Sequence, residues 1–261
     1  MAYDTLIVEN RNRVTWITLN RPAAMNSITY AMHAELQAAF DAFESDDAQW
    51  ICVVTGAGGK AFCAGTDLKE AATSTERHAY PEDGYAGLIE RFDLNKPVIA
   101  AVNGLALGGG FEVALACDLI IASENARFGL PEPLVGAVAL GGGLHRLARQ
   151  IGLKKAMGYI FTGRQMSAAE AESMGLVNEV VPADRLTEAV EAWCADMLRC
   201  APISLRASKE TVMKGLEAGG IEAAMKAQPS MPGFVKWTKA EDTREGPLAF
   251  AEKRAPVWKG K

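Results

Sequence analysis

Residues 96–122 read KPVIAAVNGLALGGGFEVALACDLIIA, and they set a glycine run and one glutamate inside a long apolar stretch. The stretch is long enough to resemble a membrane span, but Asn103, the glycines, Glu112 and Asp118 interrupt it. Short apolar runs bounded by turn residues are typical of buried strands. We therefore expect a buried strand, a glycine turn, a helix from about Phe111 and a second strand.

The sequence before this stretch also alternates strands and helices. Apolar or β-rich runs predict strands at residues 5–9, 14–19 and 50–55, the first two joined as a hairpin. Apolar residues at helical spacing predict an amphipathic helix over residues 30–45. Continuous apolar strands alternating with helices are typical of a mostly parallel, buried sheet. We predict an α/β fold that becomes mainly helical from Ser167 onward.

Composition narrows the class of protein further. The 261 residues can form one large domain, or one domain with a smaller appendage. A net charge of −5 gives no electrostatic case for binding nucleic acid or an anionic membrane. The five cysteines form no CxxC pair, which argues against a disulfide scaffold or zinc ribbon and favours a reducing, cytoplasmic compartment. The amino terminus lacks the basic and apolar regions of a signal peptide.

Two glycine-containing turns follow predicted strands, one within residues 61–68 and one at residues 108–110. Glycine lets a ligand approach the backbone closely, and N–H groups at a helix start lack partners within the helix. Such groups can stabilise a developing negative oxygen, although each turn alone could equally be a tight structural turn. Two nucleotide motifs are absent: the run at residues 56–60 lacks the Walker A spacing, and after Gly108 and Gly110 Val113 replaces the third glycine of the dinucleotide fingerprint.

Glu112 and Glu132 stand in otherwise apolar, small-residue sequence. Desolvation raises the pKa of a carboxyl toward the range where it can exchange protons at neutral pH. A single such glutamate would more often complement a helix dipole or form an ion pair. Two of them combined with two glycine turns favour an acid–base site. The three histidines show no metal-ligand spacing, and no GxSxG nucleophile motif is present.

Several motifs occur together in a specific order: Leu19–Pro22, residues 61–67, residues 96–104, Gly108–Glu112 and Pro131-Glu132. This ordered set resembles the crotonase superfamily, which includes enoyl-CoA hydratases and isomerases. The resemblance continues through Thr162–Arg164 to the carboxy-terminal run and covers nearly the whole chain. The closing residues 245–259 are most similar to the carnitinyl-CoA dehydratase branch.

The resemblance implies a spiral of ββα units over residues 1–195 and a helical trimerisation region over residues 196–261. It also implies acyl-CoA thioester substrates and a homotrimer or a dimer of trimers. It implies no metal, and no cofactor apart from the CoA of the substrate. The implied reaction is the reversible syn addition of water to a 2-enoyl-CoA. Carnitinyl-CoA dehydratase and enoyl-CoA isomerase are the alternatives.

Roles carry over from the family onto matching positions. The N–H groups of Thr66 and Gly109 match the oxyanion hole, and Glu112 and Glu132 match the two hydratase acids. The positions expected to meet the substrate or its CoA are Ala64, Asp67, Leu68, Pro131, Leu140 and Lys253. Residues 69–90 are expected to form a surface loop or a mobile helix over the site entrance.

Two departures from the family pattern concern substrate binding. Ala23 replaces a common lysine, and residues 136–143 lack a proline and contain the bulky Leu140. A different class, a binding protein like the RNA-binding relative with a lysine-rich helix, is disfavoured because residues 32–43 contain no lysine.

Overall fold

The computed structural model describes residues 3–73 and 79–261. The strands are β1 (Leu6–Arg11), β2 (Val14–Leu19), β3 (Ile51–Gly56), β4 (Ala61–Cys63), β5 (Val98–Val102), β6 (Leu105–Leu107), β7 (Leu119–Ser123), β8 (Arg127–Gly129), β9 (Met166–Ser167) and β10 (Glu179–Val181). The α-helices are α1 (Tyr30–Ser45), α2 (Leu68–Thr73), α3 (Gly109–Ala116), α4 (Gly143–Ile151), α5 (Leu153–Thr162), α6 (Ala168–Ser173), α7 (Leu186–Leu198), α8 (Pro202–Glu217), α9 (Ile221–Ala227), α10 (Pro232–Thr238) and α11 (Asp242–Ala251). Short 3₁₀ helices are η1 (Pro22–Ala24), η2 (Tyr85–Gly87), η3 (Glu132–Val135), η4 (Ala183–Arg185) and η5 (Gln228–Ser230).

The strands form a six-stranded sheet with the order β1-β2-β3-β5-β7-β10 and a four-stranded sheet with the order β4-β6-β8-β9. Consecutive strand pairs, such as β3 and β4 or β5 and β6, divide between the two sheets, so each repeat adds one strand to each. Every pairing is parallel except those of β1 with β2 and β8 with β9. The predicted α/β fold of repeated strand–strand–helix units is confirmed.

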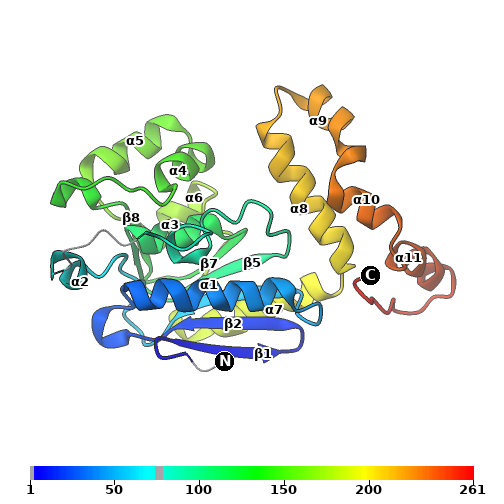
Figure 1. Cartoon of the computed structure of the whole chain (residues 1–261), viewed down its shortest axis with the longest axis horizontal. Coiled ribbons are helices and arrows are strands. Elements are labelled where there is room, and N and C mark those ends of the chain that lie inside the picture. The colour runs from blue at the N-terminus through cyan, green and yellow to red at the C-terminus, as the bar shows by residue number, and fades with distance from the viewer. Residues whose placement is uncertain (1–2, 74–78) are drawn as a thin grey trace. The chain divides into compact units, whose positions relative to one another are not determined.

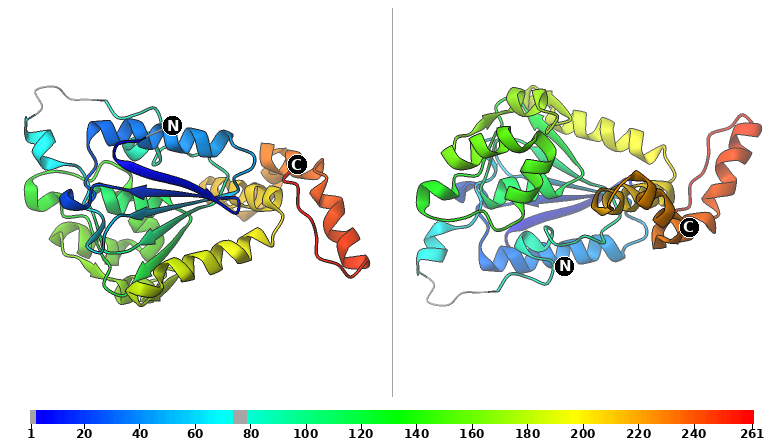
Figure 2. Two further views of the ribbon diagram at one scale, coloured as in Figure 1. Left: turned by 90° about the horizontal axis from the view of Figure 1, so that it is seen from below. Right: turned by 90° about the horizontal axis from the view of Figure 1, so that it is seen from above.

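Helix α1 lies against the six-stranded sheet, as Figures 1 and 2 show from three directions. The Thr29 hydroxyl caps its first turn by accepting a hydrogen bond from the Met32 N–H. Leu36, Phe40 and Phe43 follow at helical spacing and are buried. The predicted helix at residues 30–45 is therefore confirmed, and its apolar face explains why it packs on the sheet.

The chain divides into two compact units. The first comprises the residues up to Phe92 together with Val98–Glu191, and the second comprises Asp93–Pro97 together with Ala192–Lys261. Within the second unit, α8 and α10 pack side by side (Figure 1). The division at residues 195 and 196 drawn from the family resemblance stays a prediction. In the part of the chain that the structure describes, no helix is long and apolar enough to cross a membrane.

The expectation of a surface loop or mobile helix over residues 69–90 is only partly met. Helix α2 covers its beginning, and residues 74–78 lie outside the described residues. The end of the segment is not a surface loop, because residues 84–89 are buried, with Tyr85 only 2% exposed. Few of these residues show helical or alternating periodicity, so their burial has no local signal in the sequence.

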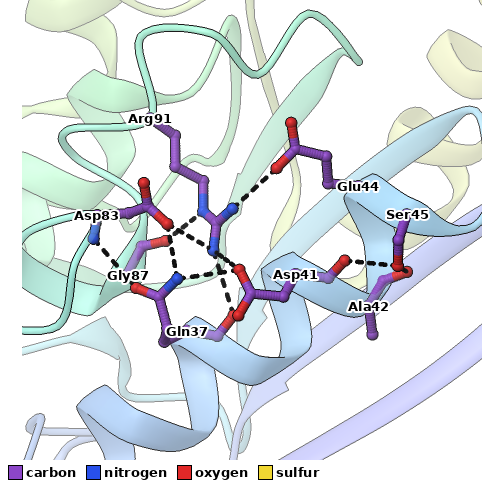
Figure 3. Close-up of polar contacts among 8 residues, drawn as sticks. All are labelled: Gln37, Asp41, Ala42, Glu44, Ser45, Asp83, Gly87 and Arg91. Carbon is purple, nitrogen blue, oxygen red and sulfur yellow. Dashed lines mark hydrogen bonds and ion pairs between the residues drawn. The ribbon is translucent and has the colours of Figure 1, made fainter.

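Arg91 holds this buried segment against α1 (Figure 3). Its guanidinium forms ion pairs with Asp41, with Glu44 at 2.9 Å and with Asp83 at 3.0 Å, and Nε donates to the Gly87 carbonyl at 2.7 Å. The Arg91 side chain is only 3% exposed, whereas its acidic partners reach solvent. One buried cation therefore joins α1 to residues 83–91.

We expect Arg91→Leu to lower the free energy of unfolding by about 2 kcal/mol, because it removes several charge-assisted hydrogen bonds at once. Urea denaturation measures the change. Arg11→Leu is the control, since its ion pair with Glu9 is exposed and should contribute less than about 1 kcal/mol. Equal effects of the two substitutions would contradict the clamping role of Arg91.

Candidate active site

The glycine run Gly108–Gly110 lies where the two sheets and α3 meet, and each glycine is required for a different reason. Gly108 has a positive φ of 54°, a conformation that side chains disfavour. A methyl group at Gly109 would overlap the phenol of Tyr85, and one at Gly110 would overlap the Cys63 carbonyl. The backbone at the start of α3 is consequently packed directly against its neighbours.

The loop after β4 approaches the same helix start. Gly65 has a φ of 89°, and a Cβ there would lie 2.8 Å from the Leu107 carbonyl oxygen and 3.0 Å from the Gly109 nitrogen. The parallel bridge of Ile28 with Thr66 uses the Gly65 carbonyl and the Asp67 N–H. The Thr66 N–H therefore points to the opposite side of this extended segment.

The loop that bears Thr66 comes close to the first residue of α3, since a Cβ at Gly65 would lie 3.0 Å from the Gly109 nitrogen. Gly109 is the first residue of α3, where the backbone N–H has no acceptor within the helix and lies at the positive end of its dipole. The expectation that the N–H groups of Thr66 and Gly109 act together stays a prediction, which the close approach of Gly65 to the Gly109 nitrogen supports. Two such donors can stabilise negative charge on one oxygen.

Glu112 lies in the first turn of α3 and is only 3% exposed. The Gly143 N–H donates to its Oε1 at 2.9 Å, and a Cβ at Gly141 would lie 2.5 Å from its Oε2. Burial raises the pKa of this carboxyl to about 6, and the charge of Glu132 adds to the rise. The N–H groups of residues 141 and 143 and the charge of Arg146 limit the rise.

Glu132 is the first residue of η3 and its side chain packs against Gly108 of the glycine run. Its Oε1 lies 3.1 Å from the position that a Cβ at Gly108 would occupy. The Gly108 carbonyl accepts a hydrogen bond from the Glu112 N–H. Burial raises the pKa of Glu132. Among the described residues its buried Oε2 has no hydrogen-bond partner. A buried carboxylate oxygen without a donor favours the protonated form or a bound ligand.

The structure adds three residues that sequence reasoning missed. Tyr85 is buried against Gly109, and its hydroxyl lies 3.2 Å from Thr66 Oγ1. His33 accepts the Ala86 N–H at Nδ1 and contacts the Tyr85 ring edge at a centroid distance of 4.6 Å. Burial lowers the pKa of His33 to about 4, so it is neutral at physiological pH. Arg146 in α4 donates to the Ile89 carbonyl at 2.6 Å and faces Glu112.

The positions expected to meet substrate fall into different surroundings. Asp67 caps α2 through the Lys69 and Glu70 N–H groups and pairs with Arg21 at 2.9 Å. Burial opposes ionisation of Asp67, but the bonds from Arg21, Glu70 and Ser27 outweigh it and lower its pKa. Its carboxylate is thus committed to local structure, a role that its place before α2 could have indicated.

The other expected positions are more open. Leu68 and Leu140 are 63% and 76% exposed, and Ala64 and Pro131 are half-buried beside Thr66 and Glu132. Lys253 lies in the second unit, just after α11, and its contact with CoA stays a prediction. Within residues 3–73 and 79–261 no group of three or more His, Cys, Asp or Glu side chains could hold a metal ion.

Comparison with known proteins identifies a family for the whole of this arrangement. The profile described as enoyl-CoA hydratase/isomerase matches residues 9–261. A carnitinyl-CoA dehydratase of Proteus mirabilis (strain HI4320) is 42% identical over 262 residues, covering 98% of this chain and 99% of the relative. A probable enoyl-CoA hydratase of Rhizobium meliloti (strain 1021) is also 42% identical, covering 99% of both chains.

Solved structures agree with the sequence comparison. The crystal structure of an enoyl-CoA hydratase from Mycobacterium tuberculosis H37Rv superposes with a TM-score of 0.91 at 36% identity. The match covers 98% of this chain and 99% of that one. The crotonase-like α/β fold implied by the sequence motifs is confirmed.

The raised pKa of Glu112 predicts a pH-dependent cost of folding. An unfolded glutamate has a pKa of about 4.3, so between about pH 4.3 and 6 the folded protein binds more protons than the unfolded chain. Stability conferred by the protonated carboxyl is therefore lost as pH rises through this window, by about 2 kcal/mol. Glu112→Gln should lack this loss. Urea denaturation of both proteins from pH 4 to 7 measures it, and parallel curves would contradict the prediction.

Proposed function

The chain belongs to the enoyl-CoA hydratase/isomerase family, and we propose that it is a hydro-lyase that reversibly adds water to the double bond of a 2-enoyl-CoA. The observation that carries this proposal is a pair of glutamates with raised pKa values, the buried Glu112 and the half-buried Glu132, which both contact Gly108. Water addition requires a base for the water and an acid for the carbon, and two carboxyls can supply both.

The oxyanion hole of the proposed site is formed by the N–H groups of Thr66 and Gly109. They would hold the thioester oxygen, which gains negative charge as the α-carbon becomes enolate-like. Donors fixed in advance stabilise this charge without reorganisation, and removal of one such donor typically costs about 10²–10³ in rate. The packing of Gly65 against Leu107 and Gly109 supports the proposal, because it fixes the backbone that bears both donors.

The surroundings of the two acids support different roles for them. Burial raises the pKa of Glu112 to about 6, which still leaves this carboxyl largely ionised at neutral pH, and the Gly143 N–H stabilises the ionised form, so Glu112 can accept a proton from the attacking water. Among the described residues Glu132 Oε2 has no donor, so a proton is favoured there and can pass to the α-carbon. In dehydration the same two groups exchange roles.

The family also supports an assembly and a binding mode for CoA. We infer a homotrimer or a dimer of trimers in which Lys253 meets a CoA phosphate of a neighbouring subunit. Ala64, Leu68, Pro131 and Leu140 would line the acyl and CoA path. Asp67 would act on that path indirectly, because it holds the start of α2. The reaction would need no metal and no cofactor beyond the CoA of the substrate.

We expect Glu112→Gln and Glu132→Gln each to lower kcat for crotonyl-CoA hydration by about 10²–10⁴. The loss of absorbance of the conjugated thioester measures the rate. Glu124→Gln is the matched control, because Glu124 is an exposed glutamate in the turn after β7. Unchanged rates in both site variants, with an active wild type, would overturn the assigned roles.

Carnitinyl-CoA dehydratase is a second candidate, favoured by the 42% identity to the Proteus mirabilis enzyme and by the closing residues 245–259. Both candidates use the same acids, so the acyl group alone separates them. We expect the purified protein to hydrate crotonyl-CoA with a higher kcat/KM than crotonobetainyl-CoA. The reverse preference, measured at equal concentrations of the two thioesters, would favour the second candidate.

A further inference from the structure

Tyr85 contacts both residues whose N–H groups form the proposed oxyanion hole. Its hydroxyl lies 3.2 Å from Thr66 Oγ1. Its ring and hydroxyl occupy the space that any side chain at Gly109 would need. Thr66 follows β4 and Gly109 begins α3, so the two donors come from separate elements. Tyr85 belongs to a third element, η2, and contacts both Thr66 and Gly109.

The backbone around Tyr85 is held in an uncommon conformation. Gly84, Ala86 and Gly87 all have positive φ, at 74°, 59° and 58°. A Cβ at Gly87 would lie 2.6 Å from the Gln37 Cα, so the segment packs directly on the α1 backbone. A left-handed alanine costs conformational energy and persists only where the surroundings fix it.

Helix α1 supplies the contacts that fix this conformation. His33 Nδ1 accepts the Ala86 N–H at 2.9 Å. The cluster around Arg91 in Figure 3 ties both ends of the segment, Asp83 and Gly87, to α1. The backbone on both sides of Tyr85 is therefore held by α1, while the Tyr85 side chain contacts Thr66 and Gly109.

The chemistry of the buried phenol argues against an acid–base role. Burial raises the pKa of Tyr85 well above its ordinary value, and the nearby Cys63 adds to the rise. Tyr85 therefore stays neutral, and its hydroxyl serves as a hydrogen-bonding group of fixed position. Of the described residues, only Thr66 lies within hydrogen-bonding distance of this hydroxyl.

We propose that Tyr85 is a positioning residue that sets the spacing and direction of the Thr66 and Gly109 N–H groups through its contacts with both. The inference rests on the proposed function of this site. Oxyanion donors act only when they lie about 2.7–3.1 Å from the developing oxyanion, so a small displacement weakens the transition state more than substrate binding. Loss of the Tyr85 hydroxyl therefore acts on kcat rather than on KM.

The test removes the hydroxyl from either partner. Tyr85→Phe keeps the ring that packs on Gly109, and Thr66→Val keeps the shape of Thr66. We expect each to lower kcat for crotonyl-CoA about five- to tenfold, with KM within about twofold, the effect of one net hydrogen bond. The double variant should cost no more than either single variant, because both remove the same interaction. Thr66→Ser retains the hydroxyl and should preserve most of kcat.

A second readout does not depend on turnover. A conjugated arylacryloyl-CoA absorbs at longer wavelength when its carbonyl oxygen is polarised, so its shift on binding reports on the two N–H donors. The shift should be smaller for Tyr85→Phe and unchanged for the control Tyr3→Phe, which removes a partly buried phenol hydroxyl at the start of the chain. Urea denaturation verifies that each variant is folded.

The outcomes separate the two proposals. An active wild type together with a Tyr85→Phe variant of full kcat and full spectral shift would overturn the role of Tyr85. Additive losses in the double variant would also overturn it, because the two hydroxyls would then act independently. A wild type that binds the arylacryloyl thioester with a spectral shift but does not hydrate crotonyl-CoA would refute the hydratase assignment. The spectral shift alone then decides the role of Tyr85.

Discussion

The site depends on one constraint, the close approach of two backbones at the start of α3. The loop after β4 and the glycine run Gly108–Gly110 are so close that Gly65 faces the Leu107 carbonyl and the Gly109 nitrogen. Glycine is the residue that permits such contact. In the proposed function, this approach fixes the backbone whose Thr66 and Gly109 N–H groups hold the thioester oxygen. A larger residue at Gly65 would push the two segments apart, because its Cβ would lie 2.8 Å from the Leu107 carbonyl oxygen.

The carboxylates are positioned by the same contact. Glu112 follows the glycine run by half a turn, and Glu132 packs against Gly108. Burial of both acids is unfavourable for the ionised forms, and the glycine loop at residues 141–143 offsets part of that cost at Glu112 only. Two chemically identical groups thus receive unequal environments. This inequality is what an acid–base pair requires, because one member must hold a proton while the other accepts one.

The sequence predicted the parts of this site that lie close together along the chain. The alternating strands and helices, the amphipathic helix at residues 30–45 and the acids beside glycine turns all have local signals. Other features arise only when distant segments meet. Asp67 pairs with Arg21 and accepts a hydrogen bond from Ser27, contacts that have no local signal, and its expected place on the substrate path stays a prediction. Residues 84–89 were expected at the surface and are buried, because their contacts are made with α1 rather than with their sequence neighbours.

Local sequence signals predict which residues carry the proposed chemistry, whereas contacts between distant segments determine how accurately those residues are placed. Motifs formed by chain neighbours encode the proposed donors and acids. Their spacing depends on a second set of contacts, in which His33 of α1 binds the Ala86 N–H and Arg91, paired with α1, binds the Gly87 carbonyl. The left-handed conformation of Ala86 and the burial of the Arg91 guanidinium both cost free energy of folding. Contacts with α1 offset this cost. In the proposed role of Tyr85, the packing of residues 83–91 on α1 fixes the position of the phenol. The phenol in turn fixes the Thr66 and Gly109 N–H groups relative to the thioester carbonyl.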